Sequence, residues 1–271
     1  MEDIDRFLQE DLGQEGDITS DSLFIDEFGT ADIISKEACV IAGLEETKKI
    51  FKKLGAETIL KINDGGFVKE ETIVAEINGP IKSILKGERL ALNFVGRMSG
   101  IATETKKIVD KCKLKNPNIK IAATRKTTPG FRKYEKKAVL LGGGEEHRFG
   151  LFDAVMIKDN HIKSIGSVEE SIKRVKEKIH NKTIEVEVEN LDDALIAVKM
   201  KVDVIMLDNL KPLQAKLIAE KIREINKSIV IEISGGITPQ NILDYASFAD
   251  RISLGYLTHS IKNKNFSLEI G

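Results

Sequence analysis

Six short β-rich runs alternate with amphipathic segments in the second half of this 271-residue chain. Helices are expected between the runs, for example over 168–179, over 191–200 after the capping-type Asn190, and from Pro239, which falls in a first turn after Thr238. This rhythm is typical of parallel βαβ units, and six such units predict an α/β barrel. The expected strands cover residues 118–125, 153–158, 184–190, 203–208, 229–234 and 251–255.

The first part of the chain reads as a compact α/β unit, in which a helix-like segment over 45–54 separates short apolar strands and ends at Gly55. A long helix from about 87 to 112 leads from this unit into the barrel. We therefore expect an N-terminal domain over 1–104, a barrel domain over 105–259 and a tail, 260–271, that returns to the first domain.

Composition excludes several classes of protein. Forty-two Lys and Arg against 43 Asp and Glu leave a net charge of -1, so the chain has no overall field for DNA, RNA or an anionic membrane. Cys39 and Cys112 lie far apart and are expected as reduced core residues, not as a disulfide or zinc site. There is no secretory-signal pattern, and no run approaches the ~18 apolar residues of a membrane span. We expect a soluble, cytoplasmic protein.

Polar or glycine residues stand at the carboxyl end of nearly every expected strand. In α/β barrels the active site is built at that end from several strands, so these residues are expected to share one pocket. Residues two apart in a strand share a face, which directs Glu185, Glu187 and Glu189 into the barrel interior, where they need cationic or hydroxyl partners. The strand-end residues are Arg125, Lys126, Lys158, Glu187, Asp208, Ser234, Gly235, Gly236 and Gly255, and by parity Glu232 and Arg251 also face inward.

Cations gather between Thr124 and His161. Two like charges ~5 Å apart repel by roughly 3 kcal/mol at an effective dielectric of 20, so the cluster favours an anionic ligand that bears carboxylates and phosphates. The basic run over 132–137 is instead interpreted as a solvated helix face, formed by Arg132, Lys133, Lys136 and Lys137. The clustered cations are Arg125, Lys126, His147, Arg148 and Lys158, near Gly130 and the glycines 142–144.

Two further groups at the strand ends suit a phosphorylated sugar. The small-residue turns at 234–236 and at Gly255 follow the last two strands, where barrels frequently hold phosphate through backbone N–H groups. Glu187 and Asp208 could accept hydrogen bonds from sugar hydroxyls, help to hold Mg²⁺, or form a structural ion pair with Lys158 or Lys126. No catalytic triad, Walker loop, dinucleotide fingerprint or zinc motif is found, so covalent catalysis is not indicated.

Ordered motifs along almost the whole chain resemble the quinolinate phosphoribosyltransferase family, the carboxylating nicotinate-nucleotide pyrophosphorylases. They are Glu10-Asp11-Leu12-Gly13, Gly16-Asp17-Ile18-Thr19, Asn93-Phe94 with Arg97, Ser99-Gly100-Ile101-Ala102-Thr103, the segment 124–161, Glu185-Val186-Glu187, Leu207-Asp208-Asn209, Ser234-Gly235-Gly236-Ile237, and Gly255 before Leu257-Thr258-His259-Ser260.

The resemblance implies a sandwich-like N-terminal α/β domain, an incomplete α/β barrel, and a homodimer with shared active sites, a hexamer being left open. It implies transfer of phosphoribosyl from 5-phosphoribosyl 1-diphosphate to quinolinate with Mg²⁺, which releases diphosphate and carbon dioxide and yields nicotinate mononucleotide for NAD biosynthesis. Mg²⁺ would be held mainly through the substrate, with Glu187 and Asp208 as candidate ligands.

The same resemblance assigns roles residue by residue. Thr124, Arg125, His147 and Arg148 would bind quinolinate, together with Arg97 of a second subunit. Lys126 and Lys158 would lie between the two substrates, and Glu187 and Asp208 would contact the ribose. The 5-phosphate cradle would consist of Ser234, Gly235, Gly236 and Gly255.

Two alternatives stay open at this stage. Another enzyme of the same fold, such as a nicotinate phosphoribosyltransferase or the related molybdenum-transport-associated protein, would not need the extra arginines beside His147. A non-catalytic barrel that senses phosphorylated sugars would not need Glu187, Asp208 and Mg²⁺ together. Gly96, which precedes Arg97, lowers local helix propensity by up to ~1 kcal/mol and is expected to loosen that helix.

Overall fold

The computed structural model describes residues 3–271, which form two compact α/β units. The first unit contains residues 3–106, 133–143 and 261–271, and the second contains residues 107–132 and 144–260. Each unit has a separate sheet. Within the described residues, no helix combines the length and the apolar character needed to cross a membrane.

The first unit is built on an antiparallel four-stranded sheet in the order β12-β1-β5-β3, with a two-stranded sheet of β2 and β4 beside it. Its strands are β1 (Phe28–Ser35), β2 (Cys39–Val40), β3 (Glu57–Leu60), β4 (Phe67–Val68), β5 (Thr72–Pro80) and β12 (Phe266–Ile270). The helices other than the long α4 are α1 (Asp3–Leu12), α2 (Ile18–Leu23), α3 (Leu44–Leu54) and α5 (Arg132–Leu141).

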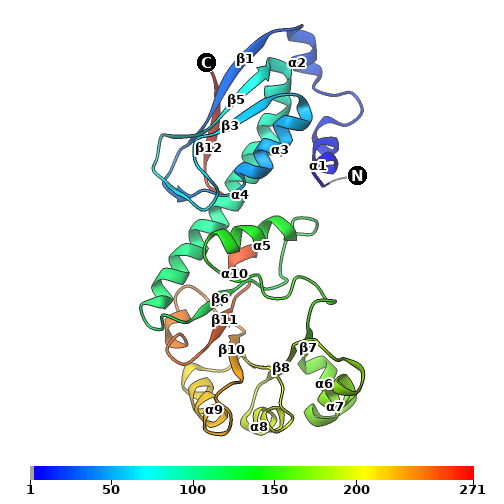
Figure 1. Cartoon of the computed structure of the whole chain (residues 1–271), viewed down its shortest axis with the longest axis vertical. Coiled ribbons are helices and arrows are strands. Elements are labelled where there is room, and N and C mark those ends of the chain that lie inside the picture. Colours follow the sequence, from blue (N-terminus) through cyan, green and yellow to red (C-terminus); the bar gives the residue numbers. More distant parts are fainter. Residues whose placement is uncertain (1–2) are drawn as a thin grey trace. The chain divides into compact units, whose positions relative to one another are not determined.

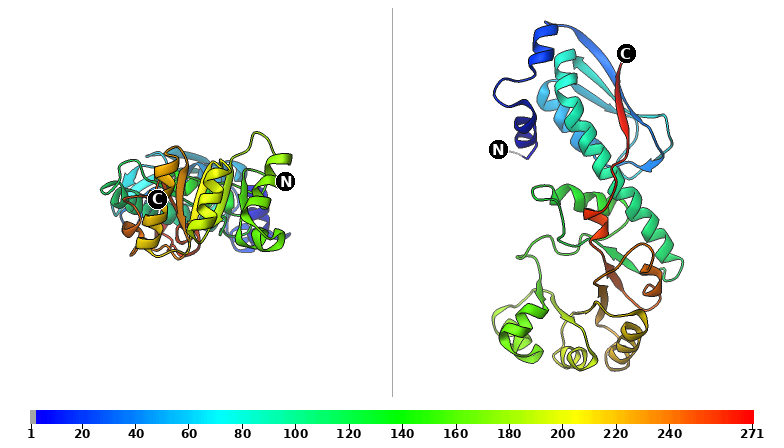
Figure 2. Two further views of the ribbon diagram at one scale, coloured as in Figure 1. Left: turned by 90° about the horizontal axis from the view of Figure 1, so that it is seen from below. Right: turned by 180° about the vertical axis from the view of Figure 1, so that it is seen from behind.

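The C-terminal strand belongs to this first unit. β12 pairs antiparallel with β1, from Ala31 opposite Ile270 to Ser35 opposite Phe266, and the right view of Figure 2 shows the two strands side by side. The helix α3 ends at Gly55 as expected, because that glycine adopts the left-handed conformation (φ 85°) that only glycine adopts without strain. The tail 261–271 therefore completes a sheet whose other strands come from the start of the chain.

Segment 133–143 differs from the boundaries expected from the sequence, which put it in the barrel domain. It groups with the first unit because its side chains pack there. The ring of Tyr134 makes an edge contact with the ring of Phe94, with centroids 4.8 Å apart. The fully buried carboxylate of Glu135 pairs with Arg97 at 2.7 Å.

The long helix α4 (Ile81–Lys113) covers the expected range and begins earlier. It runs unbroken through Gly96. A Cβ on Gly96 would lie 2.8 Å from the carbonyl oxygen of Lys264, and a Cβ on Gly100 would meet that of Lys262. The amide of Lys264 also donates to the Gly96 carbonyl at 2.9 Å. These glycines let the C-terminal segment cross the helix at close range.

The second unit contains six parallel strands in the order β6-β11-β10-β9-β8-β7. β6 and β7 stand at the two edges, so the barrel is incomplete, as the family resemblance implies. All six lie inside the ranges expected from sequence. The strands are β6 (Lys120–Ala122), β7 (Val155–Ile157), β8 (Ile184–Val188), β9 (Val204–Asp208), β10 (Val230–Ser234) and β11 (Arg251–Ser253).

Helices α6 to α9 lie on the outer side of this sheet (Figures 1 and 2). The Asn190 side chain caps α8 as expected, accepting from the amide of Asp193 at 2.9 Å. The helix expected from Pro239 is absent, because Asn241 bonds to the amide of Thr238 and to the carbonyl of Gly236, and such local bonds compete with a helix. The elements are α6 (Asp159–Ile165), α7 (Val168–Lys178), α8 (Leu191–Lys199), α9 (Pro212–Ile225), α10 (Tyr256–His259) and a 3₁₀ turn (Ile242–Asp244).

The strands of the second unit separate apolar from charged side chains by parity. Val186, Ile205 and Ile231 are fully buried and register with one another across β8, β9 and β10. Glu185 and Glu187 alternate with Val186 and are also buried, with the ionic partners described below. The predicted charged interior is therefore confirmed for these two residues, whereas Glu189 is exposed beyond the end of β8.

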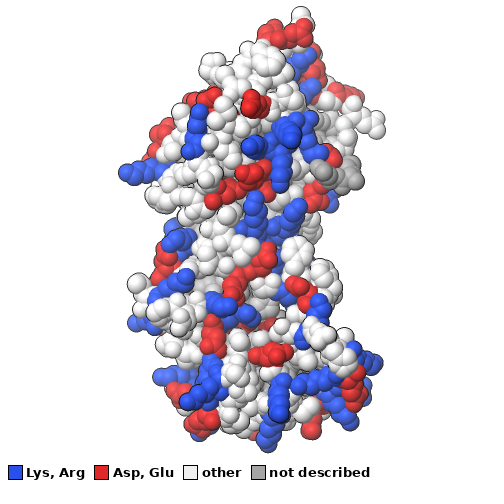
Figure 3. All heavy atoms as spheres, viewed as in Figure 1, with Lys and Arg blue, Asp and Glu red and all other residues white. Residues whose placement is uncertain are grey.

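On the face of the molecule drawn in Figure 3, cations and anions are interspersed, in line with the net charge of -1. Both cysteines are buried and free of disulfides, as expected. Burial raises the pKa of the Cys112 thiol to about 11, which keeps it protonated and unreactive at neutral pH.

Candidate active site

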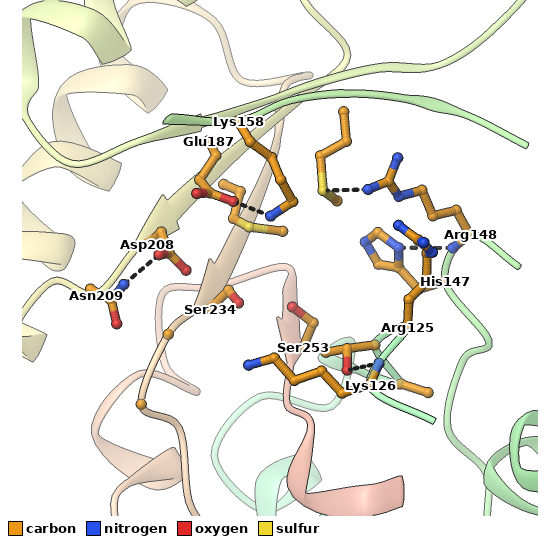
Figure 4. Close-up of a pocket in the computed structure, with 16 residues that line it drawn as sticks. Arg125, Lys126, His147, Arg148, Lys158, Glu187, Asp208, Asn209, Ser234 and Ser253 are labelled. Atoms are coloured by element: carbon orange, nitrogen blue, oxygen red, sulfur yellow. Dashed lines mark hydrogen bonds and ion pairs between the residues drawn. The ribbon is translucent and has the colours of Figure 1, made fainter. Parts of the chain in front are cut away.

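A pocket of about 450 Å³ opens at the carboxyl ends of the strands of the second unit. Figure 4 shows that its polar side chains come from β8 to β11, from the segment after β6, and from the segments before and after β7. The sequence predicted most of this lining, but not Ala123, Met156, Met206, Asn209 and Ser253. The predicted residues that line it are Thr124, Arg125, Lys126, His147, Arg148, Lys158, Glu187, Asp208, Ser234, Gly235 and Gly236.

One end of the pocket carries two carboxylates. Glu187 is 8% exposed and its Oε2 lies 2.5 Å from Nζ of the half-exposed Lys158. Burial raises the pKa of Asp208, and the Glu187 carboxylate raises it further. Asn209 donates its amide to Asp208 Oδ2 at 2.5 Å. The structural ion pair considered from sequence is thus present for Glu187, and both carboxylates still line the pocket.

The turn after β10 supplies backbone groups to the same end. Gly235 and Gly236 both have left-handed backbones, with φ of 77° and 61°. A Cβ on Gly235 would lie 2.5 Å from the backbone nitrogen of Asn209, so only glycine fits there. Asn209 is itself left-handed, with φ 54°. The ends of β9 and β10 therefore approach each other closely around this turn, a geometry suited to an anion.

Gly255 does not line the pocket. A Cβ there would lie 2.8 Å from Nε2 of His259 and 2.9 Å from Cδ of Lys126, so this glycine makes room for the Lys126 side chain. The backbone of Lys126 is held on both sides, because its amide donates to Thr124 Oγ1 at 3.1 Å and its carbonyl accepts from Thr258 Oγ1 at 2.7 Å. The place of Gly255 in a phosphate cradle stays a prediction.

The other end of the pocket is strongly cationic. Burial lowers the pKa of Arg148, and the nearby guanidinium of Arg125 lowers it further. This is the like-charge repulsion expected of the cluster. Among residues 3–271, the buried Nε of Arg125 has no hydrogen-bond partner. Arg148 donates to two weak positions, the sulfur of Met156 at 3.1 Å and the carbonyl of Ala154 at 3.5 Å. Both guanidinium groups therefore keep capacity to bind an anion.

His147 faces the barrel interior. Its Nε2 lies 3.1 Å from Glu232 Oε2 and 3.4 Å from Glu185 Oε2. Burial lowers the pKa of His147, but the two carboxylates outweigh burial and raise it to about 9. The amide of Arg148 also points at Nδ1, at 2.8 Å. Losing that hydrogen bond costs about 1 kcal/mol, less than the roughly 4 kcal/mol of one charge pair at 4 Å and dielectric 20. We therefore assign an imidazolium.

Another arginine, Arg132, connects the loops that carry these cations. Arg132 donates from Nε to Thr127 Oγ1 at 2.9 Å and from Nη1 to the carbonyl of Phe149 at 3.1 Å. The interpretation of the run 132–137 as a solvated face is therefore wrong for most of its cations. Lys136 is fully buried, and Lys137 bonds Glu46 at 2.8 Å.

Arg97 lies on α4 in the first unit. Its Nη2 and Nε contact Glu135 Oε1 at 2.7 and 3.1 Å, and its Nη1 donates to the carbonyl of Ile261 at 3.0 Å. The guanidinium is thus fixed in direction by a buried carboxylate. The expected contribution of Arg97 to the quinolinate site of a second subunit stays a prediction.

One trio of side chains has the spacing of a metal site. Ligand atoms of His147, Glu185 and Glu232 all lie within 4.8 Å of one another. Arg251 Nη1, however, lies 3.1 Å from Glu232 Oε2, so two cations already face the two carboxylates. With His147 protonated this group is neutral, and an added divalent ion would leave it with excess positive charge in a buried place.

Two family models match the chain: the N-terminal domain of quinolinate phosphoribosyl transferase over residues 17–99 and the C-terminal domain over residues 101–269. A probable nicotinate-nucleotide pyrophosphorylase (carboxylating) of Archaeoglobus fulgidus is 43% identical over 246 residues, which is 89% of this chain and 93% of the relative. The Bacillus subtilis protein of the same name is 41% identical over 271 residues, 98% of this chain and 92% of the relative.

Among solved structures, the nicotinate-nucleotide pyrophosphorylase of Ehrlichia chaffeensis superposes with a TM-score of 0.93 at 34% identity, covering 99% of this chain and 97% of that one. This likeness extends over both units. The family models, the relatives and the superposition agree with one another. The chain belongs to the quinolinate phosphoribosyltransferase family.

Proposed function

We propose that this protein transfers the phosphoribosyl group of 5-phosphoribosyl 1-diphosphate to quinolinate and decarboxylates the product, giving nicotinate mononucleotide, diphosphate and carbon dioxide. One observation carries the proposal. A single pocket places two repelling guanidinium groups, Arg125 and Arg148, at one end, and the Glu187 and Asp208 carboxylates with the glycine turn at the other. Quinolinate, a pyridine dicarboxylate, suits the first end, and a phosphorylated sugar suits the second.

The cationic end would bind and orient quinolinate. Each guanidinium offers a planar fork for one carboxylate, and binding relieves the repulsion that now lowers the pKa of Arg148. Thr124 can donate its hydroxyl to the same ligand. The ring nitrogen is then aimed toward the sugar, which replaces a bimolecular encounter by a fixed geometry.

At the other end, Glu187 and Asp208 would hold the ribose hydroxyls while the turn 234–236 holds the 5-phosphate. When the quinolinate nitrogen forms its bond to the anomeric carbon, the bond from that carbon to the diphosphate oxygen breaks, and positive charge develops on the sugar. The two carboxylates stabilise that charge, and Lys126 and Lys158 stabilise the leaving diphosphate. Lys158 reaches the substrate by leaving Glu187, which is free to accept a hydroxyl instead.

Mg²⁺ fits the oxygen donors of this end. It would be held mainly through the diphosphate, with the carboxylates of Glu187 and Asp208, which both line the pocket, as the protein ligands on offer. When bound, the ion neutralises charge that builds up on the leaving group.

Decarboxylation follows from the product of the first step. The carbon next to the new pyridinium nitrogen keeps the electron pair when its bond to the carboxylate breaks, and carbon dioxide leaves. The positive nitrogen stabilises that pair until a proton from solvent replaces the carboxylate. The role of the pocket is to hold the pyridinium in place.

We further propose a homodimer in the cytoplasm, with Arg97 of one subunit completing the quinolinate site of the other; a hexamer of such dimers stays open. The family resemblance supports the dimer, and the fixed direction of the Arg97 guanidinium is compatible with it.

The reaction itself is tested with purified protein, 5-phosphoribosyl 1-diphosphate, Mg²⁺ and quinolinate labelled in the 2-carboxylate. Labelled carbon dioxide and nicotinate mononucleotide should form in equal amounts. Arg174→Ala, on the exposed side of α7, serves as a matched control for Arg125→Ala, which should lose most of the activity. Turnover of nicotinate without release of carbon dioxide from quinolinate would show that the proposal is wrong.

A further inference from the structure

A chain of charged side chains runs through the interior of the second unit and ends at the pocket. It begins with Lys120 and Glu145, whose Nζ and Oε1 are 2.7 Å apart. Glu145 Oε2 contacts Arg251 Nε at 3.2 Å, and Arg251 Nη1 contacts Glu232 Oε2 at 3.1 Å. The same Glu232 oxygen lies 3.1 Å from Nε2 of His147. Of these residues only His147 lines the pocket.

We infer that the ion pair between the buried Glu232 and the part-buried Arg251 positions the guanidinium of Arg148 for a substrate carboxylate, by fixing the ring of His147. The inference deepens the proposed function and rests on it. Glu232 and Arg251 touch neither substrate in this account, so they act as positioning residues.

The coupling between His147 and Arg148 is local and rigid. His147 has φ 53°, a left-handed conformation that few non-glycine residues adopt, and Nδ1 of its ring lies 2.8 Å from the backbone nitrogen of the next residue, Arg148. The orientation of the ring and the direction of the peptide are therefore linked. A ring that loses its shorter contact, with Glu232, keeps only the contact with Glu185 at 3.4 Å. It can then turn, and the backbone of Arg148 turns with it.

Arg148 has little else to hold it in place. Its guanidinium donates to a thioether sulfur and to a carbonyl at 3.5 Å, and both are weak partners. Figure 4 shows this side chain reaching toward the pocket from the segment that also carries His147. The position of the guanidinium therefore depends on the backbone from which it extends.

The rest of the chain anchors that backbone to the sheet. Glu145 forms a parallel bridge with Ala122, its amide donates to Ile121 at 2.7 Å, and its carbonyl accepts from Ala123 at 2.9 Å. The segment thereby extends the open sheet beyond β6. Arg251 ties Glu145 to Glu232, which is fully buried, so the start of the segment and the His147 ring share one fixed support.

The test uses Glu232→Gln, which keeps the shape of the side chain and removes its charge. KM for quinolinate should rise about 10- to 100-fold, as expected for a misplaced binding group, while KM for 5-phosphoribosyl 1-diphosphate changes less than about twofold. Arg251→Gln should give the same split and Arg251→Lys should restore part of it. Glu177→Gln, an exposed change on α7, is the matched control.

Binding of phthalate, an unreactive benzene dicarboxylate, is measured by calorimetry on the same proteins. Phthalate should bind the wild type and bind Glu232→Gln at least about tenfold more weakly. Equal phthalate affinity, or equal rises in both KM values, would overturn the positioning role. A wild type that binds phthalate but releases no carbon dioxide from quinolinate would overturn the proposed function alone. If Glu232→Gln does not fold, the two Arg251 variants decide by the same measurements.

Discussion

Removal of His147 should destabilise the protein in a way that depends on pH. In the wild type, Glu185 Oε2 has His147 as its partner at 3.4 Å, and Glu185 Oε1 has no hydrogen-bond partner among residues 3–271. Glu232 keeps its ion pair with Arg251 when the imidazolium is lost, whereas Glu185 keeps only a weaker, longer-range attraction to Arg251. His147→Ala therefore leaves one buried carboxylate without its cation.

The size of the effect follows from two limits. An uncompensated buried charge costs about 3–5 kcal/mol, and protonation of the carboxyl caps that cost at about 1.4 kcal/mol for each pH unit above its pKa in the unfolded chain, about 4.3. Burial already raises the pKa of Glu185 in the presence of His147, and it rises further in the variant. We expect His147→Ala to lower the free energy of unfolding by about 3 kcal/mol at pH 8.

The sign of the pH dependence is fixed by linkage. The folded variant binds a proton on Glu185 at a higher pH than the unfolded chain, so its stability falls as pH rises from about 4.3, the usual Glu pKa, toward the folded pKa. The loss should therefore be smaller at pH 5.5 than at pH 8. In the wild type the raised pKa of His147, about 9, has a matching effect: its contribution is complete below about pH 6.5 and is lost as pH rises through about 9.

The assay is urea unfolding followed by far-ultraviolet circular dichroism, at one protein concentration, at pH 5.5 and pH 8. The control is His147→Ala combined with Glu185→Gln, which has the same cavity but no unpaired carboxylate. This double variant should recover about 2 kcal/mol of the loss at pH 8 and much less at pH 5.5. A single variant that loses under about 1 kcal/mol at pH 8, or a double variant that recovers nothing, would show that Glu185 does not depend on the His147 imidazolium.

Two further outcomes are expected from the site. Gly235→Ala should raise KM for 5-phosphoribosyl 1-diphosphate at least about tenfold, because its Cβ would lie 2.5 Å from the Asn209 nitrogen. The control is Gly166→Ala, at a glycine that also has a positive φ but has open space around it, and this variant should keep the wild-type KM. A Gly235→Ala variant with the same KM as the control would contradict the proposed cradle. Mixing inactive Arg97→Ala and Arg148→Ala subunits should restore part of the activity, measured as carbon dioxide release, and none after verified subunit exchange would argue against a shared pocket.

Strand positions and the pocket face were predictable from local patterns. The alternation of Glu185, Val186 and Glu187 identifies the buried and charged faces of β8 without knowledge of its neighbours. The polar residues that end the strands predict the pocket because parallel strands bring their carboxyl ends to one edge. These inferences need only the alternation of side chains between the two faces of a strand.

What sequence reasoning missed depends on contacts between distant segments. Met206 reads as an ordinary core residue, yet it lines the pocket, because it is in register with Glu187 of β8 and Glu232 of β10 and so shares their face of the sheet. Lys136 reads as a surface cation in a basic run, and its burial depends on how α5 packs in the first unit. Gly96 reads as a residue that weakens the helix, but the structure shows that its missing side chain makes room for the carbonyl of Lys264.

The pairing of β12 with β1 has a consequence for how the chain acquires its structure. The first unit is made mostly of residues that leave the ribosome early, but its sheet lacks an edge partner for β1 until residues 266–270 have been synthesised. More than two hundred residues separate the paired strands, so the loop that closes between them is among the longest the chain allows, and closing it is slow. Until then β1 presents an open edge, which the nascent chain must keep from pairing with other strands.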